Sequence, residues 1–496
     1  MQRLNTQDAL LVYGEAAGWP LHMAALQVYD AATAPGGLDV ERVRELFRQR
    51  LPHLPVFRHR LVRVPGDLDR PVWVENPGAD VAESIHGVRV PAPGTDRQLA
   101  ELAGHLYEPP IDLGGPLWEA WVIEGIEGGR VAVLTRLHHS AVDGVRGMEI
   151  QSATFDLDPA APFARPGRLP GAGEDAPGTL QLLAGAAVRQ AGMPLRLVRT
   201  AGHVARTAGR LADAARRGKL SGLALPFTAP RTSLNGAVST RRGYAFCSLS
   251  LTAAKLAARQ EQVTVNDVVL ALTGGALRRY FQERGELPAR SLTAAVPLGL
   301  PPADPSQRAS GNRWAVMVAS LATDVPDPVQ RLHKIAASAR AAKAVQQAIG
   351  PDPWLELTDV PPPMVAALAR GYSGLRLVDL HPTIVNVVIS NVRGAPFPLY
   401  FAGARMLADY PIGPVADGFG LNVTVISYLD SLDFGLSICP DLVQDPWRLV
   451  DALHAEEAQL AARYAKRPSR GQRTGRARSP ARRTAAQGTR AALTEP

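Results

Sequence analysis

The chain has 496 residues, of which 46% are hydrophobic and 20% are charged, which excludes a largely disordered protein and suits two domains of roughly 200 residues each. The formal net charge is +8, but residues 463–496 hold ten Lys or Arg and one acid, a net +9 that leaves the rest near −1. The excess positive charge therefore lies in a C-terminal tail, which argues against a folded surface that binds nucleic acid.

The two cysteines, Cys247 and Cys439, are far apart and match no metal-binding or redox spacing. So few cysteines in so long a chain indicate a reducing compartment rather than a disulfide framework. The first residues show no charged segment followed by an apolar one, so no secretory signal is expected. No apolar run reaches the roughly 18 residues that a membrane-spanning helix needs. These features predict a cytoplasmic protein.

The first 155 residues alternate short apolar strands with helical patterns, and we expect them to form an N-terminal domain. The predicted strands are residues 21–29, 61–64, 72–75, 118–126 and 130–138, and the predicted helices are residues 40–51 and 97–106. The last two strands form a hairpin around Glu127-Gly128-Gly129. A further helix is expected to begin near Asp143 or Gly147.

Residues 156–229 are expected to connect two domains. Residues 156–178 are dense in Pro and Gly, which is typical of a linker. A helical stretch follows over residues 180–220, and its second half places small apolar residues opposite four arginines, Arg199, Arg206, Arg210 and Arg217. This basic amphipathic pattern leaves two interpretations open: a surface helix packed on the second domain, or a helix lying on a membrane or lipid droplet.

Residues 230–463 are expected to form a C-terminal domain. The predicted strands are residues 291–297, 314–321, 384–390, 421–428 and 433–438, and the predicted helices are residues 262–280, 329–347 and 447–463. Mixed strands and helices in both halves predict an α/β or α+β class. Residues 464–496 are expected to be a disordered basic tail, either simply solvated or tethered to anionic lipid at about 1 kcal/mol per basic residue.

The segment HHSAVDG (His138 to Gly144) directly follows the strand 130–138. The end of a strand is a rigid support, and a histidine there suits proton transfer because its reference pKa of about 6.5 lies near neutral pH. Neighbouring side chains on a strand point to opposite faces, so only one of His138 and His139 is expected to face a substrate.

Three other interpretations apply to this segment. A single histidine after a strand is most often structural. A metal site is disfavoured because His138 and His139 diverge if extended and no second His or Cys cluster is present, so no metal is expected. A serine hydrolase would need a GxSxG turn after a strand, and Ser140 is not in such a turn.

HHxxxDG is the signature of the chloramphenicol acetyltransferase-like superfamily, and the wider chain resembles the bacterial wax ester synthase/acyl-CoA:diacylglycerol acyltransferase family. The similarity covers about residues 5–460. It is carried by an ordered set of motifs, Asp8-Ala9, Leu54–Leu61, Pro91–Gly94, Pro116–Glu119, Leu137–Gly144, Leu234–Gly236, Val265–Ala271 and Ser390–Gly394. The resemblance implies two chloramphenicol acetyltransferase-like domains, each a mixed sheet with helices, and an active-site tunnel between them.

The resemblance also implies roles for the histidine segment. His139 would be the general base, taking the proton from an acceptor hydroxyl as that oxygen attacks an acyl thioester directly, without a covalent acyl-enzyme. His138 would be a positioning residue on the opposite face. Asp143 would order the loop, usually through an arginine, and Gly144 would allow a tight turn beside it.

Five further residues match family motifs and are expected near substrate. Pro116, Leu117 and Trp118 would shape the core or the tunnel wall. Asn266 and Asp267 match a motif implicated in activity, but they also follow Thr264 where a helix cap is expected, and both interpretations stay open.

One segment departs from the family pattern. Family members usually read VPVSxR where this chain has Val296–Pro301, so a hydroxyl and an arginine are missing at the matching positions. The hydroxyl could have helped to stabilise the developing oxyanion. The departure therefore bears on substrate choice and activity level, and it leaves the base in place.

The implied function is transfer of a fatty acyl group from acyl-CoA to diacylglycerol or a long-chain alcohol, giving triacylglycerol or wax ester. Acyl-CoA would be a co-substrate without any bound cofactor, and the enzyme would be peripheral on the inner membrane face or on lipid droplets. Two alternatives remain open from the sequence: a condensation-type enzyme that uses a carrier-protein thioester, and a weakly active lipid-surface protein of the same fold.

Overall fold

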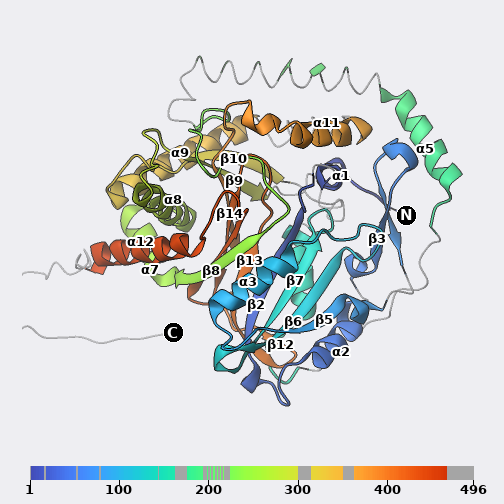
Figure 1. Cartoon of the computed structure of the whole chain (residues 1–496), viewed down its shortest axis with the longest axis horizontal. Coiled ribbons are helices and arrows are strands. Elements are labelled where there is room, and N and C mark those ends of the chain that lie inside the picture. Colours follow the sequence, from blue (N-terminus) through green and yellow to red (C-terminus); the bar gives the residue numbers. More distant parts are fainter. Residues whose placement is uncertain are drawn as a thin grey trace, which may run out of the picture.

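The computed structural model describes residues 2–15, 18–51, 54–76, 80–142, 144–161, 163, 176–193, 224–299, 314–349 and 362–465, with isolated helical residues between 198 and 216. In this part of the chain the strands form two six-stranded sheets and one three-stranded sheet, with helices around them (Figure 1). The mixed α/β class predicted from the sequence is confirmed. The basic tail and most of the second half of the 180–220 helical stretch lie outside the described residues.

The first large sheet carries the histidine segment. Its strands, in spatial order, are β12 (Tyr400–Phe401), β13 (Ala404–Ile412), β2 (His22–Asp30), β7 (Arg130–His138), β6 (Trp118–Ile126) and β5 (Ile85–Arg89). Buried residues nearly alternate along β2 and β6, as expected for strands with differently covered faces. The β6–β7 hairpin begins and ends at the predicted residues.

The second large sheet forms the core of the C-terminal half. Its strands, in spatial order, are β10 (Trp314–Ser320), β9 (Thr293–Gly299), β11 (Val387–Arg393), β14 (Leu421–Tyr428), β15 (Ser431–Ile438) and β8 (Gly243–Ser250). A single apolar core joins this sheet to the helices α7 (Leu251–Glu261), α8 (Val265–Glu283), α9 (Pro328–Ile349) and α12 (Trp447–Ala465). In Figure 1 these four helices lie together on one side of the sheet.

The remaining elements surround the first sheet. The small sheet consists of β1 (Gln2–Arg3), β4 (Val72–Glu75) and β3 (His59–Val62). The helices are α1 (Thr6–Gly14), α2 (Val40–Arg50), α3 (Asp96–Tyr107), α4 (Gly144–Thr154), α5 (Thr179–Ala191) and α11 (Pro362–Gly374). A separate apolar core unites α1 and α11 with Leu117, Ala141 and Val142, so these two helices lie over the histidine segment.

Two strands from the C-terminal half cross into the first sheet. β13 pairs antiparallel with β2 from Arg405 opposite Asp30 to Ile412 opposite Ala24. The same strand packs against β15 so closely that a Cβ on Gly435 would lie 1.7 Å from the Pro411 carbonyl oxygen, so only glycine fits there. Sheet membership therefore does not follow the proposed chain division near residue 230, and that division stays a prediction.

Candidate active site

The histidine pair is held at the end of β7 by backbone hydrogen bonds from two sides. The His138 N–H donates to the Leu117 carbonyl at 2.9 Å, and the His139 N–H donates to the Leu21 carbonyl at 3.0 Å. A turn follows, in which the Ala141 N–H donates to the His138 carbonyl at 2.9 Å. Because both sides are anchored, the two imidazoles sit on rigid backbone rather than on a free loop.

His138 is fully buried. Its Nδ1 lies 2.7 Å from the Ser140 hydroxyl and accepts a hydrogen bond from the Ser140 N–H at 3.2 Å. Its Nε2 lies 3.3 Å from Oε1 of Glu15. A ring enclosed in this way has no surface left for a substrate.

His139 keeps part of its surface exposed. Burial lowers its pKa below the ordinary 6.5; a contact between the ring and its own backbone raises the pKa, and the neighbouring His138 lowers it further. A histidine with a lowered pKa is neutral at pH 7, which is the form that accepts a proton. His139 is therefore in the form that can accept a proton.

The acidic end of the motif is only partly described. Asp143 lies outside the described residues, so its expected role in ordering the loop stays a prediction. Gly144 is the first residue of α4, which places the helix start within the region expected from the sequence. The tight turn expected at Gly144 stays a prediction too.

The Pro116-Leu117-Trp118 motif lies directly beside the histidine pair. Leu117 is buried in the core that contains Ala141, and its carbonyl receives the His138 N–H. Trp118 is also buried, packs edge-on against Phe57 at 5.0 Å between ring centroids, and donates from Nε1 to the Phe57 carbonyl at 3.3 Å. These contacts place Leu117 and Trp118 in the core next to the strand end that carries the histidines, and a role in a tunnel wall stays a prediction.

Asn266 and Asp267 lie at the start of α8 in the C-terminal half. The Asp267 carboxylate accepts hydrogen bonds from the Thr264 N–H at 2.9 Å and the Thr264 hydroxyl at 2.7 Å, which forms a capping box. The Asn266 side chain accepts a hydrogen bond from Asn391 on β11 at 3.3 Å. The structure shows the capping role for Asp267, and a role in substrate binding stays a prediction for both.

The altered segment is described in part. Val296, Pro297 and Leu298 lie in β9, and Leu298 packs against the C-terminal core. Leu300 and Pro301 lie outside the described residues. Leu298 is thus a packing residue in a strand.

Sequence reasoning missed several residues that support the site. Glu15, at the end of α1, accepts a hydrogen bond from the Leu21 N–H at 2.8 Å as well as facing His138. His22, paired with His138 across the strands, has its Nε2 2.6 Å from the Tyr107 carbonyl, and burial lowers its pKa to about 3. These contacts join residues far apart in the sequence, and no local pattern indicates them.

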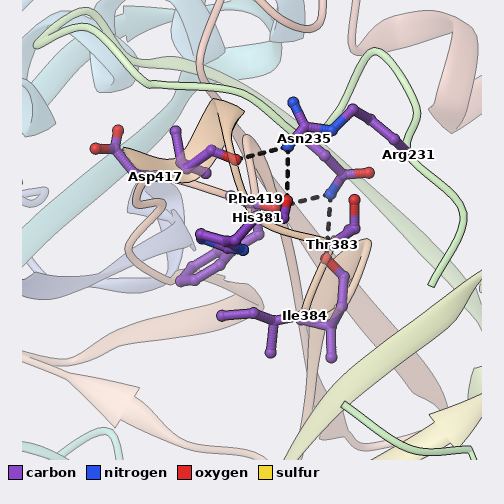
Figure 2. Close-up of a pocket in the computed structure, with 10 residues that line it drawn as sticks. Arg231, Asn235, His381, Thr383, Ile384, Asp417 and Phe419 are labelled. Carbon is purple, nitrogen blue, oxygen red and sulfur yellow. Dashed lines mark hydrogen bonds between the residues drawn. The ribbon is translucent and has the colours of Figure 1, made fainter. Parts of the chain in front are cut away.

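A pocket of about 70 Å³ lies among residues of the C-terminal half and does not include the histidine segment (Figure 2). Residues from three segments line it, 231–235, 378–385 and 417–419. The Asn235 amide ties these segments together by donating to the carbonyls of Val385 at 3.1 Å and Gly418 at 2.8 Å. One rim residue, His381, lies 2.6 Å from the hydroxyl of Tyr372, whose ring meets Trp19 edge-on at 6.3 Å.

Two other site types, a metal centre and a membrane-spanning helix, have no candidate within the described residues. No group of three or more His, Cys, Asp or Glu side chains there is placed to hold a metal ion. Among the helices in those ranges, none combines the length and the apolar character needed to cross a bilayer.

Comparison with known proteins identifies the family. The sequence model of the wax ester synthase/diacylglycerol acyltransferase catalytic domain matches residues 4–269, and that of the C-terminal domain matches residues 310–460. A Mycobacterium tuberculosis protein named as a diacylglycerol O-acyltransferase is 36% identical over 455 residues, covering 91% of this chain and 88% of the relative. The chain belongs to this family. It is therefore an acyltransferase whose acceptor is diacylglycerol or an alcohol, and a carrier-protein donor is not favoured.

Solved structures agree with this membership. The wax ester synthase/diacylglycerol acyltransferase from Marinobacter aquaeolei VT8 is 28% identical and superposes with a TM-score of 0.68, covering 94% of this chain and 100% of that one. The first condensation domain of the calcium-dependent antibiotic synthetase is 14% identical with a TM-score of 0.55, covering 94% of this chain and 97% of that one. The second likeness concerns the fold alone, and together they confirm the predicted two-domain acetyltransferase-like architecture.

Proposed function

We propose that this acyltransferase moves a fatty acyl group from acyl-CoA to diacylglycerol or a long-chain alcohol, with His139 as the general base. The observation that carries the proposal is the contrast between the two histidines: His138 is fully buried, whereas His139 keeps exposed surface and a lowered pKa. Family membership supports acyl-CoA as the co-substrate. We expect no further cofactor to be required.

The proposed step is a direct acyl transfer. The neutral ring of His139 takes the proton of the acceptor hydroxyl while its oxygen attacks the thioester carbonyl. The carbon–sulfur bond then breaks, and the imidazolium returns its proton to the departing sulfur, so that an ester and free coenzyme A result. A thiol with a reference pKa of about 8.5 leaves more readily than an alkoxide, so little further acid assistance is needed. A positioned base of this kind contributes about 10²–10⁴-fold.

We assign the other motif residues to supporting roles. His138 and Leu117 would hold the backbone that carries His139, Trp118 and Pro116 would form the wall below it, and Asp143 with Gly144 would shape the turn into α4. Asn266 and Asp267 would set the start of α8 on the opposite side of the passage between the two halves.

The test is a panel of donors and acceptors with purified protein. Labelled palmitoyl-CoA is incubated with dipalmitoylglycerol or hexadecanol, and the lipids are separated by thin-layer chromatography. We expect labelled triacylglycerol or wax ester together with free coenzyme A. Turnover of a carrier-bound palmitoyl group with none from palmitoyl-CoA would contradict the proposal.

We also propose that the enzyme works as a peripheral protein on a lipid surface. Support comes from α11 and the residue that follows it, where Met364, Leu368 and Leu375 lie at positions i, i+4 and i+11. The Leu375 N–H still donates to the Gly371 carbonyl at 3.0 Å, so the three residues share one face. We name these three residues the α11 stripe. Leu368 is 63% exposed and Leu375 is 71% exposed, whereas Ala366 on the opposite face is buried.

The surroundings of the α11 stripe fit an anionic phospholipid surface. Leu380 is a further exposed apolar residue at 79%, and Arg370 adds exposed positive charge on the same helix, while Arg376 is paired with Asp379 at 2.9 Å. Ala366 packs into the core that also holds Ala141, two residues after His139. A lipid surface bound here would bring an apolar acceptor close to the proposed base.

A further inference from the structure

The Glu15 carboxylate contacts both the ring of His138 and the backbone of Leu21, the residue that anchors His139. It follows the last residue of α1 as the C-cap, and its side chain is only 12% exposed. Oε1 accepts the Leu21 N–H at 2.8 Å and lies 3.3 Å from His138 Nε2. One carboxylate oxygen therefore faces both a backbone donor and an imidazole.

The contacts of Ser140 decide which nitrogen of His138 carries the proton. The Ser140 N–H can only donate, and it points at Nδ1 at 3.2 Å, so Nδ1 acts as an acceptor. A neutral ring then carries its hydrogen on Nε2, the atom that faces Glu15. Among the described residues this buried Nε2 has no aligned hydrogen bond, and leaving such a donor without an electrostatic partner would be costly. The Glu15 carboxylate supplies that partner.

Leu21 connects Glu15 with the second histidine. Its N–H donates to Glu15, and its carbonyl accepts the His139 N–H at 3.0 Å. The peptide units on either side of Leu21 thus link the carboxylate to the backbone of the proposed base. A displacement of Glu15 would therefore alter the position of the His138 ring and of the His139 backbone together.

We propose that Glu15 is a positioning residue for His139, acting through the His138 ring and the Leu21 backbone without touching substrate. The proposal rests on the proposed function of His139 as the base. Removing the carboxylate would leave the buried Nε2–H of His138 without its electrostatic partner and would loosen the segment that anchors His139. Because a displacement of about 1 Å can cost 10²-fold in rate, the expected effect is on kcat rather than on KM.

The test compares three variants with the wild-type enzyme. Glu15→Ala removes the acceptor, and we expect kcat to fall about 10²-fold with both KM values within about twofold of wild type. Glu15→Gln keeps an oxygen that can accept from Leu21 and from His138, and we expect it to restore kcat to within about tenfold. Glu108→Ala is the matched control, because Glu108 is the C-cap of α3, and it should leave kcat unchanged.

Histidine-selective ¹⁵N NMR supplies a readout that does not depend on turnover. We expect the His138 signals, assigned with a His138→Asn variant, to report the Nε2–H form in wild type and Glu15→Gln, and an Nε2 resonance displaced from its wild-type position in Glu15→Ala. An inactive wild type with this NMR pattern would refute the proposed function and leave the tautomer assignment standing. Wild-type kcat in Glu15→Ala, equal losses in Glu15→Ala and Glu108→Ala, or a loss that Gln does not restore would overturn the positioning role.

Discussion

The imidazole at position 139 has to be neutral before it can accept a proton from an alcohol. Burial in the protein favours that neutral form, because taking a charged ring out of water is unfavourable. The same burial makes the imidazolium formed during the reaction less stable, so the returning proton is readily passed to the sulfur. The environment of His139 therefore suits a base that must release its proton in each cycle.

Replacing His139 by Ala should lower kcat about 10²–10⁴-fold, because the base is lost. The measurement is labelled ester formed from palmitoyl-CoA and dipalmitoylglycerol under single-turnover conditions. Leu157→Ala, which truncates a side chain that is 69% exposed, is the control and should behave as wild type. A His139→Ala enzyme with full activity would refute the mechanism.

The pH dependence of kcat/KM should follow the lowered pKa of His139. The active form is the neutral ring, so activity is lost as the pH falls through the folded-state pKa, which lies below 6.5. We therefore expect a plateau from about pH 6.5 to pH 8 and an acid limb below it. Rates from pH 5 to pH 8 in constant ionic strength would test this, and an inflection above pH 7 would contradict it.

At the scale of elements, β13 contains a buried carboxylate with an unusual proton affinity. Burial raises the pKa of Asp409 to about 7 from 3.8; the Gln27 amide lowers it and Asp433 raises it. The Asp409 N–H donates to the Asp433 carboxylate at 2.9 Å, and Asp433 also accepts from Ser248 at 2.7 Å. The contact between the two large sheets thus contains two acids in a low-dielectric setting.

Asp409→Asn should change how stability depends on pH. The folded wild type holds a proton between pH 3.8 and about 7 that the unfolded chain releases, so this stabilising contribution is lost as the pH rises through that window. The full difference corresponds to at most about 4 kcal/mol. The variant should therefore gain stability relative to wild type between pH 5 and pH 8, as measured by thermal melts at both values. A melting-temperature difference that is the same at both values would refute this reading of Asp409.

Local patterns were enough to predict the elements that depend on local rules. The β6–β7 hairpin follows from its glycine turn, and the α8 capping box follows from Thr264 and Asp267. β13 was missed because its sequence, ARMLADYPI, includes a buried acid and a proline, and because its partner β2 lies some 380 residues earlier in the chain. A strand whose stability comes from distant partners leaves little trace in its own sequence.

The same distinction applies to the site. Strand alternation predicted that only one histidine could face a substrate, and the structure buries His138 while His139 keeps exposed surface. Glu15 could not be found in this way, because it contacts His138 only once α1 has packed against the end of β7. Residue type and strand position are visible in a sequence, whereas the supporting contacts arise only after folding.

At the scale of the whole molecule, the α11 stripe should control binding to lipid. We expect the double change Leu368→Ser and Leu375→Ser to weaken binding to vesicles containing phosphatidylglycerol about tenfold or more, since losing about 1.4 kcal/mol of apolar burial already suffices. Flotation of the full chain measures the bound fraction, and Leu157→Ser with Leu256→Ser is the matched control. Equal flotation of both double variants and wild type would contradict the proposal, and a loss only on deleting residues 464–496 would assign binding to the tail.

The passage of β13 into the first sheet has a consequence for biosynthesis. As the chain leaves the ribosome, one edge of β2 stays unpaired until β13, which ends at Ile412, has been synthesised. During that interval an apolar strand edge is available to other chains, which is the circumstance that favours aggregation. Halves of the chain divided near residue 230 should therefore aggregate when each is expressed alone. Recovery of active enzyme should depend on both halves being produced in the same cell.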